Sequence, residues 1–295
     1  MLNRRRLLQS ASAVAGSALL PQARVSAQNS EFKGRLRPGL VAYSFRGPLA
    51  AKKMTYEDLI RYAAGLGFEG LDTTVYWFPD TSDQFLANLR RTAYRNGISL
   101  YSVAARVRLC QPTAELRAAE VENAKKWIDV AYKLGASHVR VFGGTVPKGV
   151  SEEQAIDWAA EVLKPAADYA GPKGVFVGVE DDGGLSTNAA PTIAIIRKAD
   201  SPWAGMNVDA GNFPKDGYAQ TEMSIPYAVS THIKSTISTP EGTKEKTDFD
   251  RLFALFAKGG YRGFVSLEYE ANDPEVAVPR LAPELIRCAR KYSGA

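Results

Sequence analysis

The chain has 295 residues and a formal net charge of +5, and four of its positive charges are arginines within the first 27 residues, where no acidic residue occurs. Subtracting these four charges leaves about +1 for the remainder, which argues against a nucleic-acid partner, since such a partner would need a surplus of Lys and Arg on one face. The roughly 268 residues that follow are close to the ~250 of a typical (β/α)₈ barrel, and the only two cysteines, Cys110 and Cys288, are expected to be separate buried thiols.

The N-terminal segment has the pattern of an export signal. Residues 3–9 resemble a twin-arginine motif, and the apolar, small-residue stretch over 11–20 is too short for a membrane span. Residues 25–27 offer a small-x-small cleavage site. We therefore predict a twin-arginine signal peptide over 1–27, a linker over 28–37 and a protein that is periplasmic or otherwise exported. The alternative is a basic tail that precedes an ordinary helix.

From residue 38 to the C-terminus, strand-like and helix-like segments alternate. The strand-like segments are short apolar runs, at 39–44, 70–75, 98–104, 138–142, 175–180, 205–209, 228–235 and 263–268. The helical segments begin at capping residues or end near glycine, at 56–66, 82–96, 113–134, 151–170, 191–199, 216–227, 248–258 and 274–292. Pro226 is expected to interrupt the sixth of these helices.

Eight strands that alternate with eight helical links predict an α/β protein with a single closed (β/α)₈ TIM barrel over residues 38–295. An open, doubly wound sheet fits the count less well, and two domains are possible at this length but not required. No Gly-x-Gly-x-x-Gly follows the first strand and no phosphate-binding P-loop occurs, so nothing supports nucleotide binding.

Each of the last four strands ends, or nearly ends, on a residue of a metal-ligand type: Glu180, Asp209, His232 and Glu268. Because the C-terminal ends of barrel strands meet at one face, neighbouring strands would bring these four side chains together. Any one of them alone is more simply a surface residue, but four in succession favour a site for one divalent ion such as Mn²⁺, Mg²⁺, Co²⁺ or Zn²⁺. The other histidine, His138, lies within a strand and is expected to be structural, with its ring in the helix layer.

The chain resembles the xylose isomerase-like TIM barrel superfamily, in its sugar phosphate isomerase/epimerase branch. The motifs that carry the resemblance span most of the chain, at 67–72, 179–184, 208–213, 231–234 and 260–270. The resemblance implies that the metal is held by Glu180, Asp209, His232 and Glu268. The chain departs from the family at Asp182 and Asn212, where many relatives carry histidine, and these departures leave the substrate and the reaction open.

The residue types also suggest the chemistry. Removal of the proton next to a sugar carbonyl gives an enediolate, whose charge a divalent ion stabilises. One carboxylate can take the proton and another, on the opposite face of the substrate, can return it. We expect Glu180 and Glu268 to be this catalytic pair, as in the family's epimerases. The handedness of the substrate decides which of them is the base.

Several polar and aromatic residues at or just past strand ends are candidates for substrate binding: Tyr43, Trp77, Asp182, Asn212 and Lys234. Aromatic rings there, with Tyr76, would stack on a sugar or simply pack the rim. Lys234 follows His232 by two residues and should point to the same side of its strand. Arg46 and Arg106 are expected to form plain surface salt bridges.

These observations favour an exported, metal-dependent sugar isomerase or epimerase whose partner is a small sugar or sugar derivative. A lyase or dehydratase acting on oxidised sugars, inososes or glycosides is the first alternative, and a non-catalytic carbohydrate-binding protein is another. An abasic-site endonuclease of the same superfamily is disfavoured, because its three-zinc cluster needs several histidines and this chain has two. We expect no nucleic-acid partner and no membrane span after signal removal. A homo-oligomer is compatible with the sequence.

Overall fold

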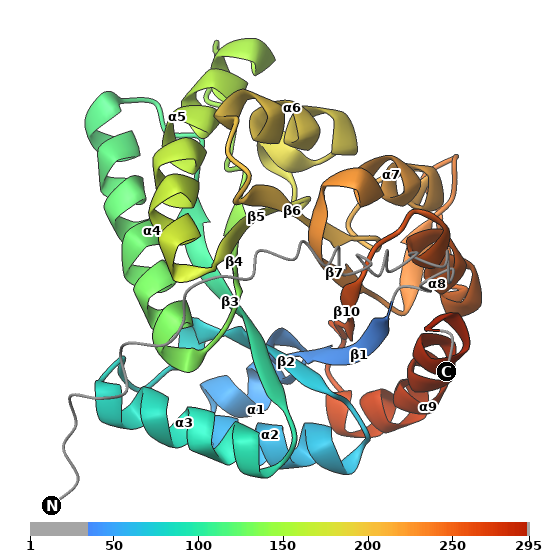
Figure 1. The fold of residues 1–295 in the computed structure, drawn as a ribbon. Coiled ribbons are helices and arrows are strands. Elements are labelled where there is room, and N and C mark those ends of the chain that lie inside the picture. Colours follow the sequence, from blue (N-terminus) through green and yellow to red (C-terminus); the bar gives the residue numbers. More distant parts are fainter. Residues whose placement is uncertain (1–34, 294–295) are drawn as a thin grey trace, which may run out of the picture. The chain divides into compact units, whose positions relative to one another are not determined.

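The structure is a computed structural model that describes residues 35–293, so the predicted signal peptide and most of the predicted linker lie outside the described residues. Eight parallel strands close into a barrel in the order β1-β10-β7-β6-β5-β4-β3-β2, which places strands that follow one another along the chain side by side (Figure 1). The barrel strands are β1 Leu36–Val41, β2 Gly70–Thr74, β3 Ser99–Arg108, β4 His138–Phe142, β5 Phe176–Glu180, β6 Ala204–Asp209, β7 Ala228–Ile233 and β10 Gly263–Leu267. The predicted TIM barrel is confirmed.

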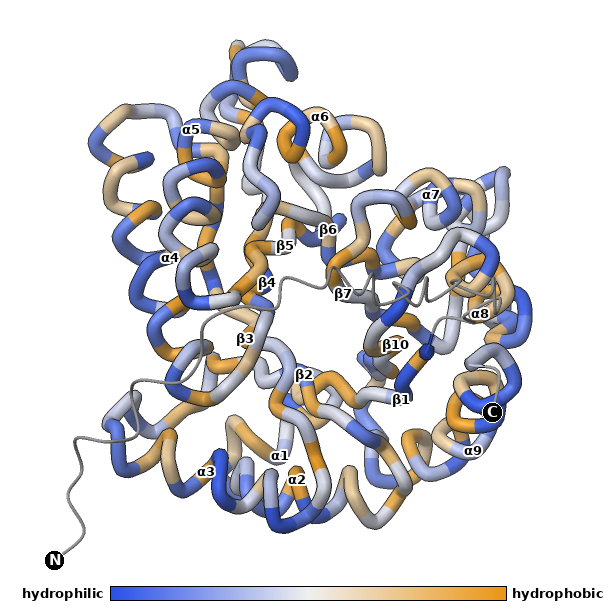
Figure 2. Tube along the Cα trace, viewed as in Figure 1, coloured by the Kyte–Doolittle hydropathy of each residue, from blue (hydrophilic) through white to orange (hydrophobic). Residues whose placement is uncertain are grey.

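Helices surround the barrel and cover its outer face (Figure 1). They are α1 Arg46–Ala50, α2 Tyr56–Gly65, α3 Asp83–Arg95, α4 Ala114–Leu134, α5 Glu152–Ala170, α6 Ala189–Ala199, α7 Gly217–Ser224, α8 Phe249–Lys258 and α9 Pro274–Tyr292. The longer helices alternate hydrophilic and hydrophobic positions, as expected for helices that bury one face against a barrel (Figure 2). Among the described helices, none is long and apolar enough to cross a membrane.

Local capping explains where several helices begin and end. The Thr55 side chain accepts a hydrogen bond from the Asp58 backbone N–H, and the Asp58 carboxylate accepts one from the Thr55 backbone, so a full capping box starts α2. Ser151 caps α5 through the backbone N–H of Gln154. Gly135 ends α4 at φ 76°, a left-handed conformation that favours glycine.

Three local features differ from the sequence-based expectation. The first strand begins at Leu36, inside the range 28–37 predicted as linker, and ends at Val41, where a 3-10 turn follows. Strand β3 runs on to Arg108, four residues further than expected. A short antiparallel hairpin, β8 Thr236–Ser238 and β9 Lys244–Lys246, follows β7 and was not predicted.

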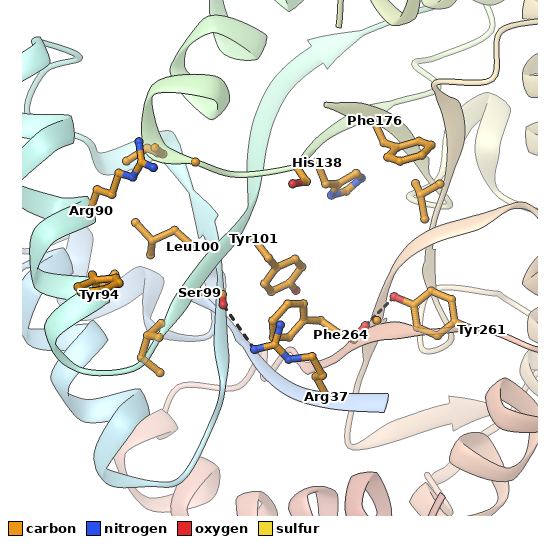
Figure 3. A pocket seen from close by; sticks show the side chains of 17 residues that line it. Arg37, Arg90, Tyr94, Ser99, Leu100, Tyr101, His138, Phe176, Tyr261 and Phe264 are labelled. Carbon is orange, nitrogen blue, oxygen red and sulfur yellow. Dashed lines mark hydrogen bonds between the residues drawn. The ribbon is translucent and has the colours of Figure 1, made fainter. Parts of the chain in front are cut away.

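Aromatic packing fills the N-terminal end of the barrel interior. Tyr101 and Phe264 stack with ring centroids 4.0 Å apart, and the Arg37 guanidinium lies 4.2 Å from the centre of the Phe264 ring. Gly70 makes room for this arrangement, since a Cβ there would lie 2.3 Å from the Phe264 ring. Figure 3 shows these side chains around a cavity of about 520 Å³ that reaches out to α3. No cluster of metal-ligand residues lines this cavity.

His138 lies at this end of the interior, and its predicted placement in the helix layer is wrong. Successive side chains of a strand alternate between faces, and Arg140 on the same strand points into the barrel, so His138 does too. The His138 Nδ1 lies 2.8 Å from Ser102 Oγ. Burial lowers the pKa of His138 to about 4, which keeps the ring neutral. The two cysteines are buried and free, as predicted.

Candidate metal centre and substrate pocket

The four predicted ligands meet at the C-terminal end of the barrel. Glu180 ends β5, Asp209 ends β6, His232 lies in β7 and Glu268 directly follows β10. One ligand atom from each lies within 4.8 Å of the others, and all four side chains are buried. The parallel register sets Asp209 opposite His232, so the two side chains stand at the same height in neighbouring strands. Closure of the barrel then brings Glu268 alongside.

Three carboxylates surround the His232 ring. Its Nδ1 lies 3.1 Å from Glu180 Oε1 and 3.9 Å from Glu268 Oε2, and its Nε2 lies 3.3 Å from Asp72 Oδ2 on β2. Burial alone would lower the pKa of His232, but the carboxylates of Asp72 and Glu180 outweigh it and hold that pKa well above its usual range. Metal-ligating histidines commonly donate their second ring N–H to a carboxylate, which is the position of Asp72 here.

Arg140 on β4 is a buried cation beside the cluster. Its Nε lies 3.3 Å from Glu180 Oε2, and only 3% of the residue is exposed. Burial raises the pKa of Glu180, but Arg140 and His232 offset this effect and hold the pKa below its usual value. Burial raises the pKa of Glu268 to about 8, although Lys234 acts against the rise. The two carboxylates of the predicted pair therefore sit in different electrostatic environments.

Lys234 approaches the cluster from the pocket side, as predicted. Its Nζ lies 3.2 Å from Asp209 Oδ2 and 3.5 Å from Glu268 Oε2, and it donates a hydrogen bond of 2.6 Å to Asn212 Oδ1. The nearby carboxylates outweigh burial and hold the pKa of Lys234 well above its usual range. Lys234 also pairs with Glu270 at 3.0 Å.

A further layer of polar groups supports the ligands from behind. The Asp181 carboxylate accepts a 2.7 Å hydrogen bond from the backbone N–H of Asp209, and Asn207 donates one of 3.0 Å to Glu180 Oε1. Burial and the neighbouring Asp209 raise the pKa of Asp181 well above its usual range. Asp209 Oδ2 is buried and accepts no hydrogen bond from the described residues, which is typical of an oxygen that faces a ligand position.

Asp72 and Arg140 were missed by the sequence-based reasoning. Both lie within strands rather than at strand ends, where the search for ligands was directed. A signal was present in β4, because a charged residue flanked by Val139 and Val141 must face the barrel interior if the valines face the helices.

A cavity of about 270 Å³ opens over the cluster. Its lining includes four of the five predicted substrate residues and several others: Tyr43, Tyr76, Arg106, Arg108, Arg140, Phe142, Glu180, Asp182, Asn212, Lys234, Glu268 and Glu270. The fifth predicted residue, Trp77, does not line the cavity. Its ring stacks against Tyr43, with centroids 6.0 Å apart, and so supports the cavity wall.

The predicted surface salt bridges of Arg46 and Arg106 are wrong. Arg46 donates hydrogen bonds to backbone carbonyls after β10, including that of Tyr269 at 3.3 Å. The Arg106 guanidinium lies over the Tyr76 ring, 4.0 Å from its centre. Within residues 35–293 no carboxylate oxygen is close enough to either guanidinium for an ion pair. Arg46 is bound by carbonyl groups instead, and Arg106 by the face of an aromatic ring.

Comparisons with known proteins agree with this geometry. The sequence model described as "Xylose isomerase-like TIM barrel" matches residues 60–292. No curated protein matches the sequence.

Solved structures share the fold at low sequence identity. The D-psicose 3-epimerase of Clostridium cellulolyticum H10, solved with D-tagatose, is 16% identical with a TM-score of 0.68, and the match covers 87% of this chain and 98% of that chain. The 3-keto-D-glucoside 4-epimerase of E. coli is 15% identical with a TM-score of 0.68, over 86% and 99% of the two chains. The IOLI protein, which has a bound zinc atom, is 16% identical with a TM-score of 0.66, over 87% and 96%.

Proposed function

The chain belongs to the xylose isomerase-like TIM barrel family, and on that premise we propose that it is a divalent-metal-dependent sugar isomerase or epimerase that moves a proton next to a carbonyl. The observation that carries the proposal is the buried cluster of Glu180, Asp209, His232 and Glu268 at the floor of a sugar-sized cavity. The structural relatives that are sugar epimerases support the same reaction class.

The side chains around the cluster support a divalent ion. The buried carboxyl groups of Asp72, Glu180, Asp209 and Glu268 surround the site, and Arg140 and Lys234 form ion pairs with members of this group. The oxygen and imidazole ligands suit Mn²⁺, Mg²⁺, Co²⁺ or Zn²⁺, and the zinc-bound IOLI relative is consistent with this range.

The two glutamates are placed to transfer the proton. A divalent ion bound in the cluster would supply positive charge that stabilises the substrate oxygen as the proton leaves. Glu180 approaches the cavity from β5 and Glu268 from the far side of the cluster, after β10, so one can remove the proton and the other can return it. Lys234 and Asn212 are proposed to hold substrate oxygens by hydrogen bonds. Asn212 orients a hydroxyl but carries no proton near neutral pH.

A lyase on the same site is the second candidate. Asp182 lines the cavity, and burial together with Glu180 raises the pKa of its carboxyl group. A carboxyl group with a raised pKa can protonate a leaving group, which an epimerase does not need. A metal-binding protein that turns over no sugar would instead support the carbohydrate-binding alternative.

Proton exchange tests the proposal directly. The mature protein is incubated in D₂O with Mn²⁺, and separately with EDTA, together with a panel of ketoses, 3-keto sugars and inosose, and carbon-bound deuterium is followed by NMR. We expect uptake that requires Mn²⁺ and is lost in Glu180→Gln. A deuterated sugar isomer identifies an epimerase or isomerase, and an unsaturated or cleaved product identifies a lyase. Bound metal without exchange in any sugar would contradict the proposal.

Export is a separate proposal that rests on the sequence of residues 3–27 alone. We propose that the twin-arginine pathway carries the protein across the membrane. Replacing both Arg4 and Arg5 by Lys should retain the protein in the cytoplasmic fraction. Unchanged fractionation of that double variant would contradict export by this route.

A further inference from the structure

One wall of the cavity is made of arginines from two neighbouring strands. Arg106 and Arg108 come from the extended end of β3, and Arg140 comes from β4. The register pairs Ala104 with Arg140 and Arg108 with Phe142, so Arg140 lies deeper in the barrel and the two β3 arginines lie nearer the mouth. This wall exists because β3 continues four residues beyond Ala104.

The two guanidinium groups from β3 lack the acidic partners that would neutralise them. Within the described part of the chain, neither Arg106 nor Arg108 forms an ion pair, and both residues are exposed. The Arg106 side chain is nevertheless held in place, because it stacks on the Tyr76 ring at 4.0 Å. In the buried Arg140 side chain, the Nε group is paired with Glu180 Oε2 at 3.3 Å, whereas the Nη1 group makes no hydrogen bond to the described residues. Buried donors of this kind are costly unless they meet a ligand.

The acidic residues that line the cavity do not supply the missing charge. Glu180 and Glu268 belong to the proposed metal centre, and Glu270 is paired with Lys234 at 3.0 Å. Asp182 is the remaining lining carboxylate, and the charges that affect its pKa most are those of the cluster, Arg140 and Lys234 rather than the two β3 arginines. The β3 side of the mouth therefore carries two uncompensated positive charges.

We propose that the substrate carries an anionic group, a carboxylate or a phosphate ester, and that Arg106 and Arg108 bind it, with Arg140 contributing donors below them. The guanidinium fork matches the oxygens of either group and binds them in pairs. Stacking on Tyr76 orients Arg106 in advance, so little conformational entropy is lost on binding. This inference rests on the proposed function, because it assigns the part of the sugar that lies away from the reacting carbon.

Binding of three matched ligands tests the inference without relying on turnover. D-glucose, D-glucuronate and D-glucose 6-phosphate are titrated into the Mn²⁺-loaded mature protein by calorimetry at low salt and in a phosphate-free buffer. We expect one or both anions to bind about tenfold or more tighter than glucose. Whichever of D-glucuronate and D-glucose 6-phosphate binds more tightly shows whether the site prefers a carboxylate or a phosphate ester. Added NaCl should weaken that preference.

The double variant Arg106→Gln/Arg108→Gln should lose the preference, so that neither anion binds tighter than glucose. Both side chains are exposed, so the variant is expected to fold, and Arg91→Gln, an exposed arginine of α3, is the matched control. Equal affinity for all three ligands would overturn the inference, and so would a preference that survives in the double variant. Proton exchange with a neutral sugar but no anion preference overturns this inference alone. Anion preference without exchange, either in the neutral panel or in keto sugars that carry the preferred anion, overturns the proposed reaction alone.

Discussion

The two ends of the barrel interior are built from the same eight strands but differ in composition: aromatic packing dominates one end, and ionisable side chains dominate the other. At the N-terminal end, Tyr101 and Phe264 stack and burial keeps the His138 ring neutral. At the C-terminal end, carboxylates are crowded around His232, and Asp209 Oδ2 is paired with Lys234 but accepts no hydrogen bond from the described residues. The strand starts serve stability, whereas the strand ends gather the groups that could hold a metal ion and a substrate.

The largest difference between the two ends should appear in catalysis. Glu180→Gln keeps the shape of the side chain and removes the proton acceptor, so we expect metal-dependent deuterium exchange to fall by about a thousandfold. The matched change at the other end, His138→Gln, should leave the exchange rate nearly unchanged because His138 does not line the cavity over the cluster and is not one of the four candidate ligands. Similar losses of the exchange rate in both variants would show that catalysis does not depend specifically on the C-terminal end of the barrel.

The second effect concerns Asp72 on β2, whose carboxylate lies 3.3 Å from Nε2 of His232 on β7. Asp72→Asn removes the negative charge beside His232 Nε2, and we expect Mn²⁺ affinity to fall by about 10- to 100-fold. Isothermal titration of the metal-free protein measures this change. Asp200→Asn, an exposed acidic residue after α6, is the control. Unaltered affinity in a folded Asp72→Asn protein would show that the carboxylate does not support the ligand.

The third effect is a pH dependence of stability that arises at the N-terminal end. His138 has a folded-state pKa of about 4 against an ordinary value of 6.5, so the unfolded chain takes up the proton first. Its contribution is complete above pH 6.5 and is lost as the pH falls towards 4. In metal-free protein, His138→Gln should reduce the loss of unfolding free energy between pH 8 and pH 5 by about 2 kcal/mol. Parallel pH profiles for the two proteins in urea denaturation would contradict the assignment.

The smallest effect is expected from Tyr101→Phe. The Tyr101 hydroxyl lies 2.6 Å from Ser266 Oγ, and its removal costs one neutral hydrogen bond while the ring stack on Phe264 remains. We expect the free energy of unfolding to fall by about 1 kcal/mol, with no change in Mn²⁺ affinity. Urea denaturation and metal titration check the two parts. A loss of Mn²⁺ affinity would contradict this expectation, because it would show that packing at the N-terminal end affects the metal site at the C-terminal end.

Most of the fold and the convergence of the four candidate ligands could be predicted from the sequence, because each depends on a local pattern. Short apolar runs between capped helices indicate barrel strands, and a carboxylate directly after such a run marks a strand end. Glu180 and Glu268 are found in this way. The extension of β3 to Arg108 and the β8–β9 hairpin were missed because both depend on contacts with distant segments, such as the hydrogen bond from Lys244 to the carbonyl of Gly211.

The orientation of side chains inside the barrel was harder to predict. Asp72 and Arg140 contribute to the centre only because closure sets β2 and β4 around the same axis as β5 and β7. His138 was placed on the wrong face because its strand was considered without the alternation that Arg140 implies. Arg106 was assigned a salt bridge, although its partner is the ring of Tyr76 on another strand-to-helix connection.

Metal binding is the most direct test of the difference between the two ends. Protein treated with EDTA and dialysed is titrated with Mn²⁺, and bound metal is counted by elemental analysis for the wild type, Asp209→Asn and His138→Gln. We predict one ion per chain in the wild type and in His138→Gln, and strongly reduced binding in Asp209→Asn. A wild-type chain that binds no divalent ion, or an Asp209→Asn chain that binds it undiminished, would contradict a metal centre at the C-terminal end of the barrel.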